Sequence, residues 1–329
     1  MMHGVVLLGD LNGQELLLAL ARPGEPPGDH EVFACATALE LESVFKQRLE
    51  GLDGEELIGA AISAAGPLLD GAIRVTRTDL SLSGAWLRHV LRTPRVFLLN
   101  DLAAVALGAP KVPEEQLTTL HPARADRGGA MAVIGLGLGL GVAGLTPQRG
   151  DNWTAIPSEA GHVDFCPAEP REVPVFEAIR ARRGDTAAER LLSRAGLSDI
   201  YAAVHGGPGA IGPENAAEAI ERARGGELAA LKAMSIFSGL LGGFAGDMAL
   251  TFAARGGVYL DSSLIQDMGD LLDLEAFQRR FRAKGLMSDY MLGIPVMQMP
   301  GRPVLLGLSS LFSASDRVYG ATDVKFLDC

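Results

Sequence analysis

The stretch Val96-Phe97-Leu98-Leu99-Asn100-Asp101 is followed directly by a small, mostly apolar segment, Leu102 to Leu107. Its first four residues form a short apolar run, which is typical of a strand buried in a parallel sheet. The pattern after Asp101 predicts a helix. A carboxylate at the carboxyl end of such a strand lies where open α/β sheets bind their ligands. Asp101 is therefore a candidate functional residue, and the alternative is that it only caps the following helix.

Length and composition restrict the class of protein. The 329 residues are enough for two domains, and the low aromatic content of 5% means that the core must rest on Leu, Val, Ile and Ala. The net charge of -11 disfavours binding to a nucleic acid backbone. The three cysteines lack CxxC spacing, as is typical of a reducing cytoplasm. We find no secretion signal and no apolar stretch of the roughly 20 residues that a membrane span requires. We therefore expect a cytoplasmic protein that binds neither nucleic acid nor membrane.

Hydrophobic periodicity predicts the other elements. Strands are expected at 5–8, 16–20, 57–64, 130–134, 257–260 and 295–299, and helices at 39–49, 85–91, 173–192 with a break at 184, most of 214–254, and near 304–312. Asp70-Gly71 predicts a hairpin. Gly9 to Gly13 is expected to form a tight turn. A strand, a glycine turn and a second strand occur at 5–20 and again at 130–145, as expected of a duplicated sheet unit.

A glycine-rich segment runs from Gly135 to Gly144, and Gly139 to Gly144 matches GxGxxG. A dinucleotide-binding motif would require a helix next, whereas the following residues, Thr146 to Asn152, have the composition of a turn. The segment therefore predicts a glycine-rich hairpin between two strands.

Four segments in this order resemble the bacterial glucokinase family, within the hexokinase and actin-like ATPase fold. They are Leu8-Gly9-Asp10 with its hairpin, Leu99-Asn100-Asp101, the Gly135 to Gly141 hairpin, and Glu159-Ala-Gly161-His162-Val-Asp-Phe; a fifth, Ala188 to Ser193, follows. The resemblance extends from about Gly4 to Phe312. It implies an α/β protein with the two-domain actin-like ATPase (ribonuclease H-like) fold, in which mixed sheets are flanked by helices and a cleft separates the domains.

We expect two domains and a tail. A small α/β domain is expected at 1–110, completed by a C-terminal helix at about 303–315. A large α/β domain is expected at 111–302, with a linker-like break after Pro110, and a tail at 316–329. Relatives suggest a homodimer.

Family members bind glucose through residues that match Asn100, Asp101, Glu159, His162 and Glu189. Buried polar groups select sugar hydroxyls because they are left unpaired when a hydroxyl is missing or inverted. The resemblance implies that Asp101 takes the proton from the 6-hydroxyl as it attacks the γ-phosphorus of ATP. Asp10 would contact Mg²⁺ through water, and Gly13, Gly137 and Gly139 would contact the nucleotide.

Two of these residues have other interpretations. His162 could be a buried core histidine, or a metal ligand together with Glu159 and Asp164. Thr186-Ala-Ala-Glu189 matches a capping box, which would make Glu189 a helix-start carboxylate.

The nucleotide motifs depart from the family pattern, in which the first phosphate loop is Asp-x-Gly-Gly-Thr-Asn. Here it is Asp10-Leu11-Asn12-Gly13-Gln14-Glu15, and Glu15 would bring a carboxylate near the polyphosphate unless its side chain points away. Leu138 stands where the second loop has threonine. Asp261-Ser262-Ser263 replaces the Gly-Gly of the adenosine segment, and Gly307-Leu308-Ser309 replaces a Gly-Ser-Gly-like turn. In the loop on the sugar side, Arg77 and Leu80 replace asparagine and tryptophan.

These observations leave three functions open. The first is a glucokinase, with ATP and glucose giving glucose 6-phosphate and ADP, whose degraded ATP motifs make the activity weak or absent. The second is a non-catalytic sugar-binding sensor or regulator. The third is an interaction protein that has lost both sites.

Overall fold

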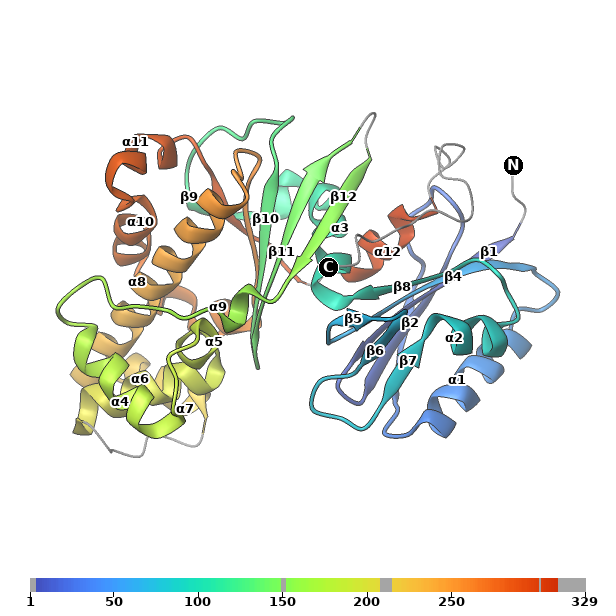
Figure 1. The fold of residues 1–329 in the computed structure, drawn as a ribbon, viewed down its shortest axis with the longest axis horizontal. Helices are drawn as coiled ribbons and strands as arrows, with labels where there is room; N and C mark the ends of the chain where they lie inside the picture. The colour runs from blue at the N-terminus through green and yellow to red at the C-terminus, as the bar shows by residue number, and fades with distance from the viewer. Residues whose placement is uncertain (1–3, 149–151, 208–214, 302, 313–329) are drawn as a thin grey trace. The chain divides into compact units, whose positions relative to one another are not determined.

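The computed structural model describes residues 4–148, 152–207, 215–301 and 303–312. The tail expected at 316–329 lies outside these residues. The chain divides into two compact units: one combines the chain up to Val112 with the C-terminal helix, and the other is Pro113–Gly301. Each unit is an α/β structure with its own main sheet (Figure 1). The expected limits of the domains, as independently folding parts, stay a prediction.

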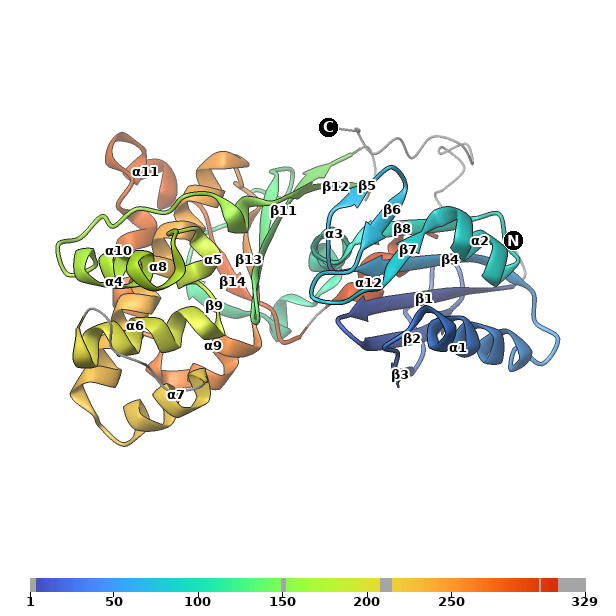
Figure 2. The same cartoon turned by 60° about the horizontal axis from the view of Figure 1, so that its bottom comes forward.

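The first unit is built on a five-stranded sheet with the order β3-β2-β1-β4-β8 and carries a small three-stranded sheet, β5-β6-β7. Helices α1 and α2 lie side by side (Figure 2), and α12 packs on α3. The elements are β1 (Val5–Asn12), β2 (Glu15–Ala21), β3 (His30–Ala34), α1 (Ala38–Glu50), β4 (Leu57–Ala64), β5 (Leu68–Leu69), β6 (Ala72–Arg74), β7 (Ser81–Ser83), α2 (Gly84–Leu91), β8 (Val96–Asn100), α3 (Asp101–Gly108), η1 (Ala109–Lys111) and α12 (Val304–Ser310).

The second unit is built on a six-stranded sheet with the order β12-β11-β10-β13-β14-β9. Its elements are η2 (Glu114–Gln116), β9 (Thr118–His121), β10 (Met131–Leu136), β11 (Leu140–Pro147), β12 (Trp153–Ser158), η3 (Ala160–His162), α4 (Val173–Arg183), α5 (Ala188–Leu191), α6 (Arg194–Gly206), α7 (Ala216–Arg224), α8 (Leu228–Thr251), β13 (Gly257–Asp261), α9 (Ser263–Met268), η4 (Gly269–Leu271), α10 (Leu274–Arg282), η5 (Gly285–Met287), α11 (Ser288–Met291) and β14 (Val296–Gln298).

The two sheets share one topology. In each, three consecutive antiparallel strands are followed by two strands that run parallel to the first: β4 and β8 after β1, and β13 and β14 after β10. The recurrence of strand, glycine turn and strand in the sequence is therefore a real repeat of the sheet unit. The sheet of the second unit adds β9 as an antiparallel edge strand.

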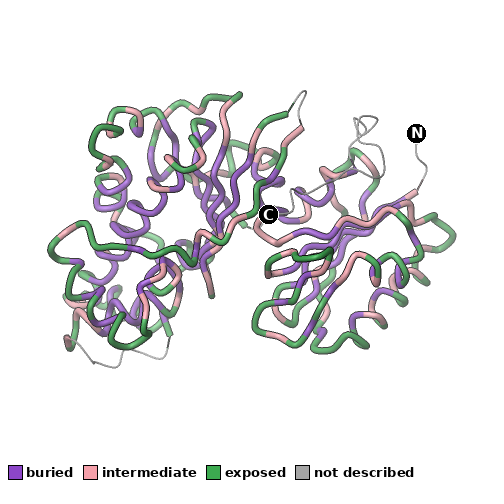
Figure 3. Tube along the Cα trace, in the orientation of Figure 1, coloured by how far each residue is buried: buried purple, intermediate pink, exposed green. Residues whose placement is uncertain are grey.

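The longest helix, α8, has the length and apolar composition of a membrane span, so the expectation that no stretch is long enough was wrong. Its most apolar window is 72% buried within the protein, where α8 packs against α10 and α6 (Figure 3). The close packing depends on Gly242, because a Cβ there would lie 2.1 Å from the carbonyl oxygen of Phe277. Helix α8 is thus the central core helix of the second unit.

One local prediction was wrong. Gly9 to Asn12 continue strand β1, and the turn is limited to Gly13 and Gln14 because Asn12 pairs with Glu15. Leu80, in the loop expected on the sugar side, is buried in the core of the first unit. Gly307 to Ser309 lie within α12, as the helix predicted near 304–312 requires, and a Cβ on Gly307 would lie 1.9 Å from the carbonyl oxygen of Ala104 in α3.

We expect the burial of His121 to make the stability of the second unit depend on pH. It is buried beside Phe281, and its Nδ1 lies 3.0 Å from the carbonyl oxygen of Ile294. Burial lowers the pKa of His121 below its ordinary value of about 6.5. The unfolded chain therefore binds a proton more readily, and the free energy of unfolding should fall as the pH drops below about 6.5. Urea unfolding at several pH values should show a smaller fall for His121→Gln than for the exposed control His89→Gln. Equal pH slopes would contradict this assignment.

Candidate functional site

The first candidate residues lie where β8 ends and α3 begins. Asn100 caps α3: its Oδ1 accepts hydrogen bonds from the backbone N–H groups of Leu102 (2.9 Å) and Ala103 (3.2 Å), and its Nδ2 donates to the carbonyl of Gly66 (3.0 Å). Asp101 is the first residue of the helix and is half-buried. The alternative that Asp101 serves as the cap is therefore wrong. Its carboxylate lies at the helix N-terminus, where negative charge is favourable.

Strand pairing places Glu15 on the same side of the first sheet as Asp10. Asn12 and Glu15 are directly opposite in the antiparallel pair of β1 and β2, and such partners point to one face. Asp10 is two residues before Asn12, so it points to that face as well. Asp10 is buried, and its carboxylate accepts a hydrogen bond of 2.7 Å from the hydroxyl of Ser63 on β4. The exposed carboxylate of Glu15 therefore lies on the same face as that of Asp10.

In the second unit, β10 and β11 form the expected hairpin instead of a dinucleotide-binding motif. Leu136 pairs with Leu140, so Gly137, Leu138 and Gly139 make the turn. The Leu138 side chain is 71% exposed. It offers no hydroxyl to a ligand at this turn.

The Glu159-to-His162 segment is held against the start of β11 by close backbone packing. A Cβ on Gly161 would lie 1.9 Å from the carbonyl oxygen of Leu140, so this position admits only glycine without a shift of the backbone. The His162 N–H donates to the carbonyl of Glu159 (2.9 Å) and closes the turn of η3. Both Glu159 and His162 are exposed. The interpretation of His162 as a buried core histidine is therefore wrong.

A short antiparallel pairing brings His162 and Glu189 together. Asp164 and Ala187 form an isolated β-bridge; the Phe165 N–H donates to the carbonyl of Thr186 (3.0 Å), and the Ala188 N–H to that of Val163 (2.9 Å). The predicted capping box is wrong, because α5 begins at Ala188 without a side-chain cap. Instead, a carboxylate oxygen of Glu189 accepts a hydrogen bond of 3.0 Å from the Leu140 N–H. Glu189 thus joins α5 to the glycine-rich hairpin.

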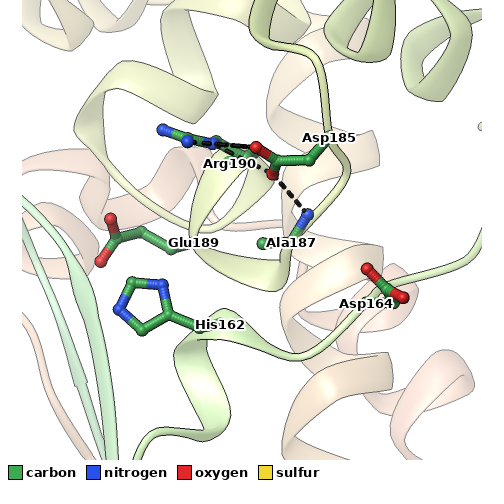
Figure 4. Close-up of a pocket in the computed structure, with 6 residues that line it drawn as sticks. All are labelled: His162, Asp164, Asp185, Ala187, Glu189 and Arg190. Atoms are coloured by element: carbon green, nitrogen blue, oxygen red, sulfur yellow. Dashed lines mark hydrogen bonds and ion pairs between the residues drawn. The ribbon is translucent and has the colours of Figure 1, made fainter.

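These residues line a hollow of about 260 Å³ in the second unit, formed by His162, Asp164, Asp185, Ala187, Glu189 and Arg190. Figure 4 shows the side chains of His162 and Glu189 close to each other. Asn100 and Asp101 belong to the other unit, and Glu159 is not among the residues lining the hollow. Within residues 4–148, 152–207, 215–301 and 303–312, no three His, Cys, Asp or Glu residues are arranged to hold a metal ion, so the metal interpretation of His162 finds no support.

The sequence pattern did not single out Asp185 and Arg190, which hold one wall of the hollow. The guanidinium of Arg190 donates to both carboxylate oxygens of Asp185, which also accepts from the Ala187 N–H (3.1 Å) (Figure 4). These hydrogen bonds lower the pKa of Asp185 below its ordinary value, those from Arg190 most of all. Asp185 therefore fixes the N-terminal end of α5, which carries Glu189. The only signal in the sequence was two opposite charges five residues apart.

Comparison with known proteins decides the family. The family model described as Glucokinase matches residues 7–314. The chain belongs to the glucokinase family. It is 52% identical over 320 residues to a glucokinase-like protein of Caulobacter vibrioides, covering 97% of this chain and 100% of the relative. It is 34% identical to a glucokinase of Chromobacterium violaceum, covering 92% of this chain and 88% of the relative.

Solved structures confirm the predicted actin-like ATPase fold. A glucokinase from an Antarctic psychrotroph superposes with a TM-score of 0.82 at 24% identity, covering 94% of this chain and 98% of the other. A glucokinase from Balamuthia mandrillaris, in complex with glucose, superposes with a TM-score of 0.75 at 22% identity and covers 94% of this chain and 93% of the other. The chain thus has the fold of these two glucokinases.

Proposed function

We propose that this protein transfers the γ-phosphoryl group of ATP to the 6-hydroxyl of glucose. The observation that carries the proposal is the hollow in which the Asp164–Ala187 pairing places His162 beside Glu189, two of the residues that the family resemblance assigns to the sugar. Two hydrogen-bonding side chains in a common hollow support the proposed sugar site.

Each proposed sugar contact has the hydrogen-bonding groups that a hydroxyl requires. One oxygen of the Glu189 carboxylate accepts a hydrogen bond from the Leu140 N–H. The two oxygens of a carboxylate have about four acceptor positions in all. His162 can donate or accept. The Asn100 side-chain oxygen accepts hydrogen bonds from the N-terminus of α3, and one amide hydrogen is donated to the Gly66 carbonyl. The second amide hydrogen can donate to a sugar hydroxyl. Glu159 is exposed and adds a further acceptor.

Asp101 is the proposed general base. It would accept the proton of the 6-hydroxyl as that oxygen attacks the γ-phosphorus, a role that suits a carboxylate within hydrogen-bond reach of the nucleophile. Mg²⁺ prefers hard oxygen ligands and keeps several bound waters. The buried carboxylate of Asp10 would accept hydrogen bonds from water bound to the ion. Magnesium would neutralise charge on the transferred phosphoryl group. Gly13, Gly137 and Gly139 lie in the two turns proposed to approach the phosphates.

Two observations favour a second candidate, a protein that binds the sugar without phosphorylating it. Glu15 shares a face with Asp10, and like charges about 4 Å apart repel by roughly 4 kcal/mol at an effective dielectric near 20. Leu138 leaves the second turn without a hydroxyl. Both features weaken binding of a polyphosphate while leaving the sugar residues in place.

Activity and binding measurements distinguish the two. Calorimetry with glucose should show binding in both cases. A coupled assay with ATP, Mg²⁺ and glucose should show turnover above that of Asp101→Asn if the protein is a kinase. Glucose binding without turnover, for several sugars and donors, would favour the sensor, and absence of sugar binding would contradict both.

Glu189 provides a prediction for the sugar site. Glu189→Gln keeps an oxygen that can accept from Leu140 but loses the charge, so glucose affinity should fall about tenfold, since a hydrogen bond to a charged group contributes roughly 1.5–3 kcal/mol. Glu189→Ala also leaves the Leu140 N–H unpaired and should reduce affinity further. Calorimetry with glucose measures both, and the exposed Glu177→Gln on α4 serves as the control. Unchanged affinity in Glu189→Ala would remove Glu189 from the site.

A further inference from the structure

A second group of contacts lies where the parallel strands β10 and β13 of the second unit end. Ligands of open α/β sheets bind outside the carboxyl ends of such strands. Strand β10 is followed by the turn of Gly137, Leu138 and Gly139, and β13 ends at Asp261 and is followed by α9. Side chains that reach both of these segments can therefore contact a ligand bound at this edge.

Arg194, the first residue of α6, joins the two segments. Its backbone N–H donates to the carbonyl of Gly137 (2.9 Å), which ties α6 to the hairpin turn. Its Nη2 donates to the hydroxyl of Ser263 (3.0 Å) and to the carboxylate of Asp267 (2.6 Å), both in α9. The guanidinium thus lies at the sheet edge, and the side chain remains 29% exposed.

The guanidinium has binding capacity left for an anion. Arginine has five N–H donors in a planar fork that matches phosphate oxygens. Both side-chain bonds of Arg194 come from Nη2, so Nε and Nη1 make no hydrogen bond to the described residues. The neighbouring turn supplies no hydroxyl, because Leu138 occupies its middle position. Arg194 can therefore donate hydrogen bonds to an anion at this turn, which has no side-chain hydroxyl.

We propose that Arg194 binds the phosphate oxygens of the phosphoryl donor, and that Asp267 is its counter-ion when no donor is bound. The ligand is a polyphosphate chain, carried by a nucleoside triphosphate or by an inorganic polyphosphate. The inference rests on the proposed kinase function for the identity of the donor. It assigns to this chain a phosphate-binding side chain on the donor side of the reaction.

Calorimetry with three probes tests the assignment. Mg²⁺-ATP, inorganic tripolyphosphate and adenosine are titrated into the wild type, Arg194→Gln, Asp267→Asn and the control Arg222→Gln, whose guanidinium pairs with Glu218 on α7. Arg194→Gln should weaken binding of both phosphate-bearing probes about tenfold, as expected for one charge-assisted contact. Adenosine binding should not change. Asp267→Asn should tighten phosphate binding about threefold, since it removes the competing carboxylate. A preference for ATP over tripolyphosphate would identify a nucleotide donor, and the reverse an inorganic one.

The two variants separate phosphate binding from a structural role. If Arg194 only ties α6 to α9, Asp267→Asn should weaken binding in the same direction as Arg194→Gln, and adenosine binding should fall as well. If Arg194 blocks the donor site, Arg194→Gln should bind phosphate more tightly. Either result overturns the inference, as does a wild type that binds neither phosphate-bearing probe. Glucose titrated into the same samples tests the sugar site separately. If glucose still binds when the phosphate results contradict the inference, the proposed sugar binding is unaffected.

Discussion

Replacing Asp101 by asparagine is expected to lower kcat for glucose phosphorylation by about 10³-fold, because general base catalysis contributes roughly 10²–10⁴ to such reactions. Asparagine has nearly the shape of aspartate but cannot accept the proton of the 6-hydroxyl. The backbone should be unaffected, since Asn100, and not Asp101, caps α3. A coupled assay measures the rate, and calorimetry measures glucose affinity, which should change by less than the rate does.

The control for Asp101→Asn is Asp53→Asn. Asp53 lies in the same unit and has a φ of 47°, a left-handed backbone that asparagine also tolerates. This variant should retain wild-type kcat and glucose affinity. A kcat for Asp101→Asn within a few-fold of wild type would remove Asp101 as the base. Equal losses of rate and of glucose affinity would assign it to sugar binding only.

Much of the fold could be predicted from short apolar runs and glycine turns. Strands β4, β8 and β10 were predicted because they are buried in their sheets and thus apolar along their length. The repeated strand, turn and strand predicted the shared topology because each copy begins one sheet. The Asp70-Gly71 hairpin followed from its turn residues, which have φ values of 50° and 74°.

Other elements depend on contacts that a local pattern does not contain. Strand β3 is a largely exposed edge strand without an apolar run, so periodicity missed it. Leu80 is buried because its side chain packs in the core of the first unit, although its segment has the composition of a loop. Gly307 lies in a predicted helix, but the close approach of α12 to α3 that this glycine permits could not be predicted from its local sequence.

The sequence predicted which residues form the candidate site but not how they are arranged in space. His162 and Glu189 lie on separate segments, and the pairing of Asp164 with Ala187 that brings them together is a tertiary contact. The hydrogen bond from the Leu140 N–H to Glu189 is also a tertiary contact and could not be predicted. The local sequence matched a capping box instead. The family resemblance supplied the residues, and the long-range backbone pairing supplied their geometry.

Replacing Gly161 by alanine is expected to have a large effect on the proposed sugar site. The new Cβ would lie 1.9 Å from the carbonyl oxygen of Leu140, so η3 or the start of β11 must move. Overpacking of this kind costs about 1–3 kcal/mol. The movement also affects the Leu140 N–H, which holds the Glu189 carboxylate, and it displaces His162 in the next position. We expect glucose affinity to fall more than tenfold and the Leu140 amide to exchange its hydrogen faster.

Gly301→Ala is the matched control, because no atom lies within 4 Å of a Cβ built there. It should change neither the glucose affinity nor the exchange of the Leu140 amide. Hydrogen exchange distinguishes a local effect from general destabilisation: amides of β10, which is buried in the middle of the sheet, should stay protected in Gly161→Ala while that of Leu140 does not. Wild-type glucose affinity in Gly161→Ala would mean that the contact between η3 and β11 does not position the sugar-binding residues. Uniform loss of protection would mean that the glycine serves only the stability of the whole unit.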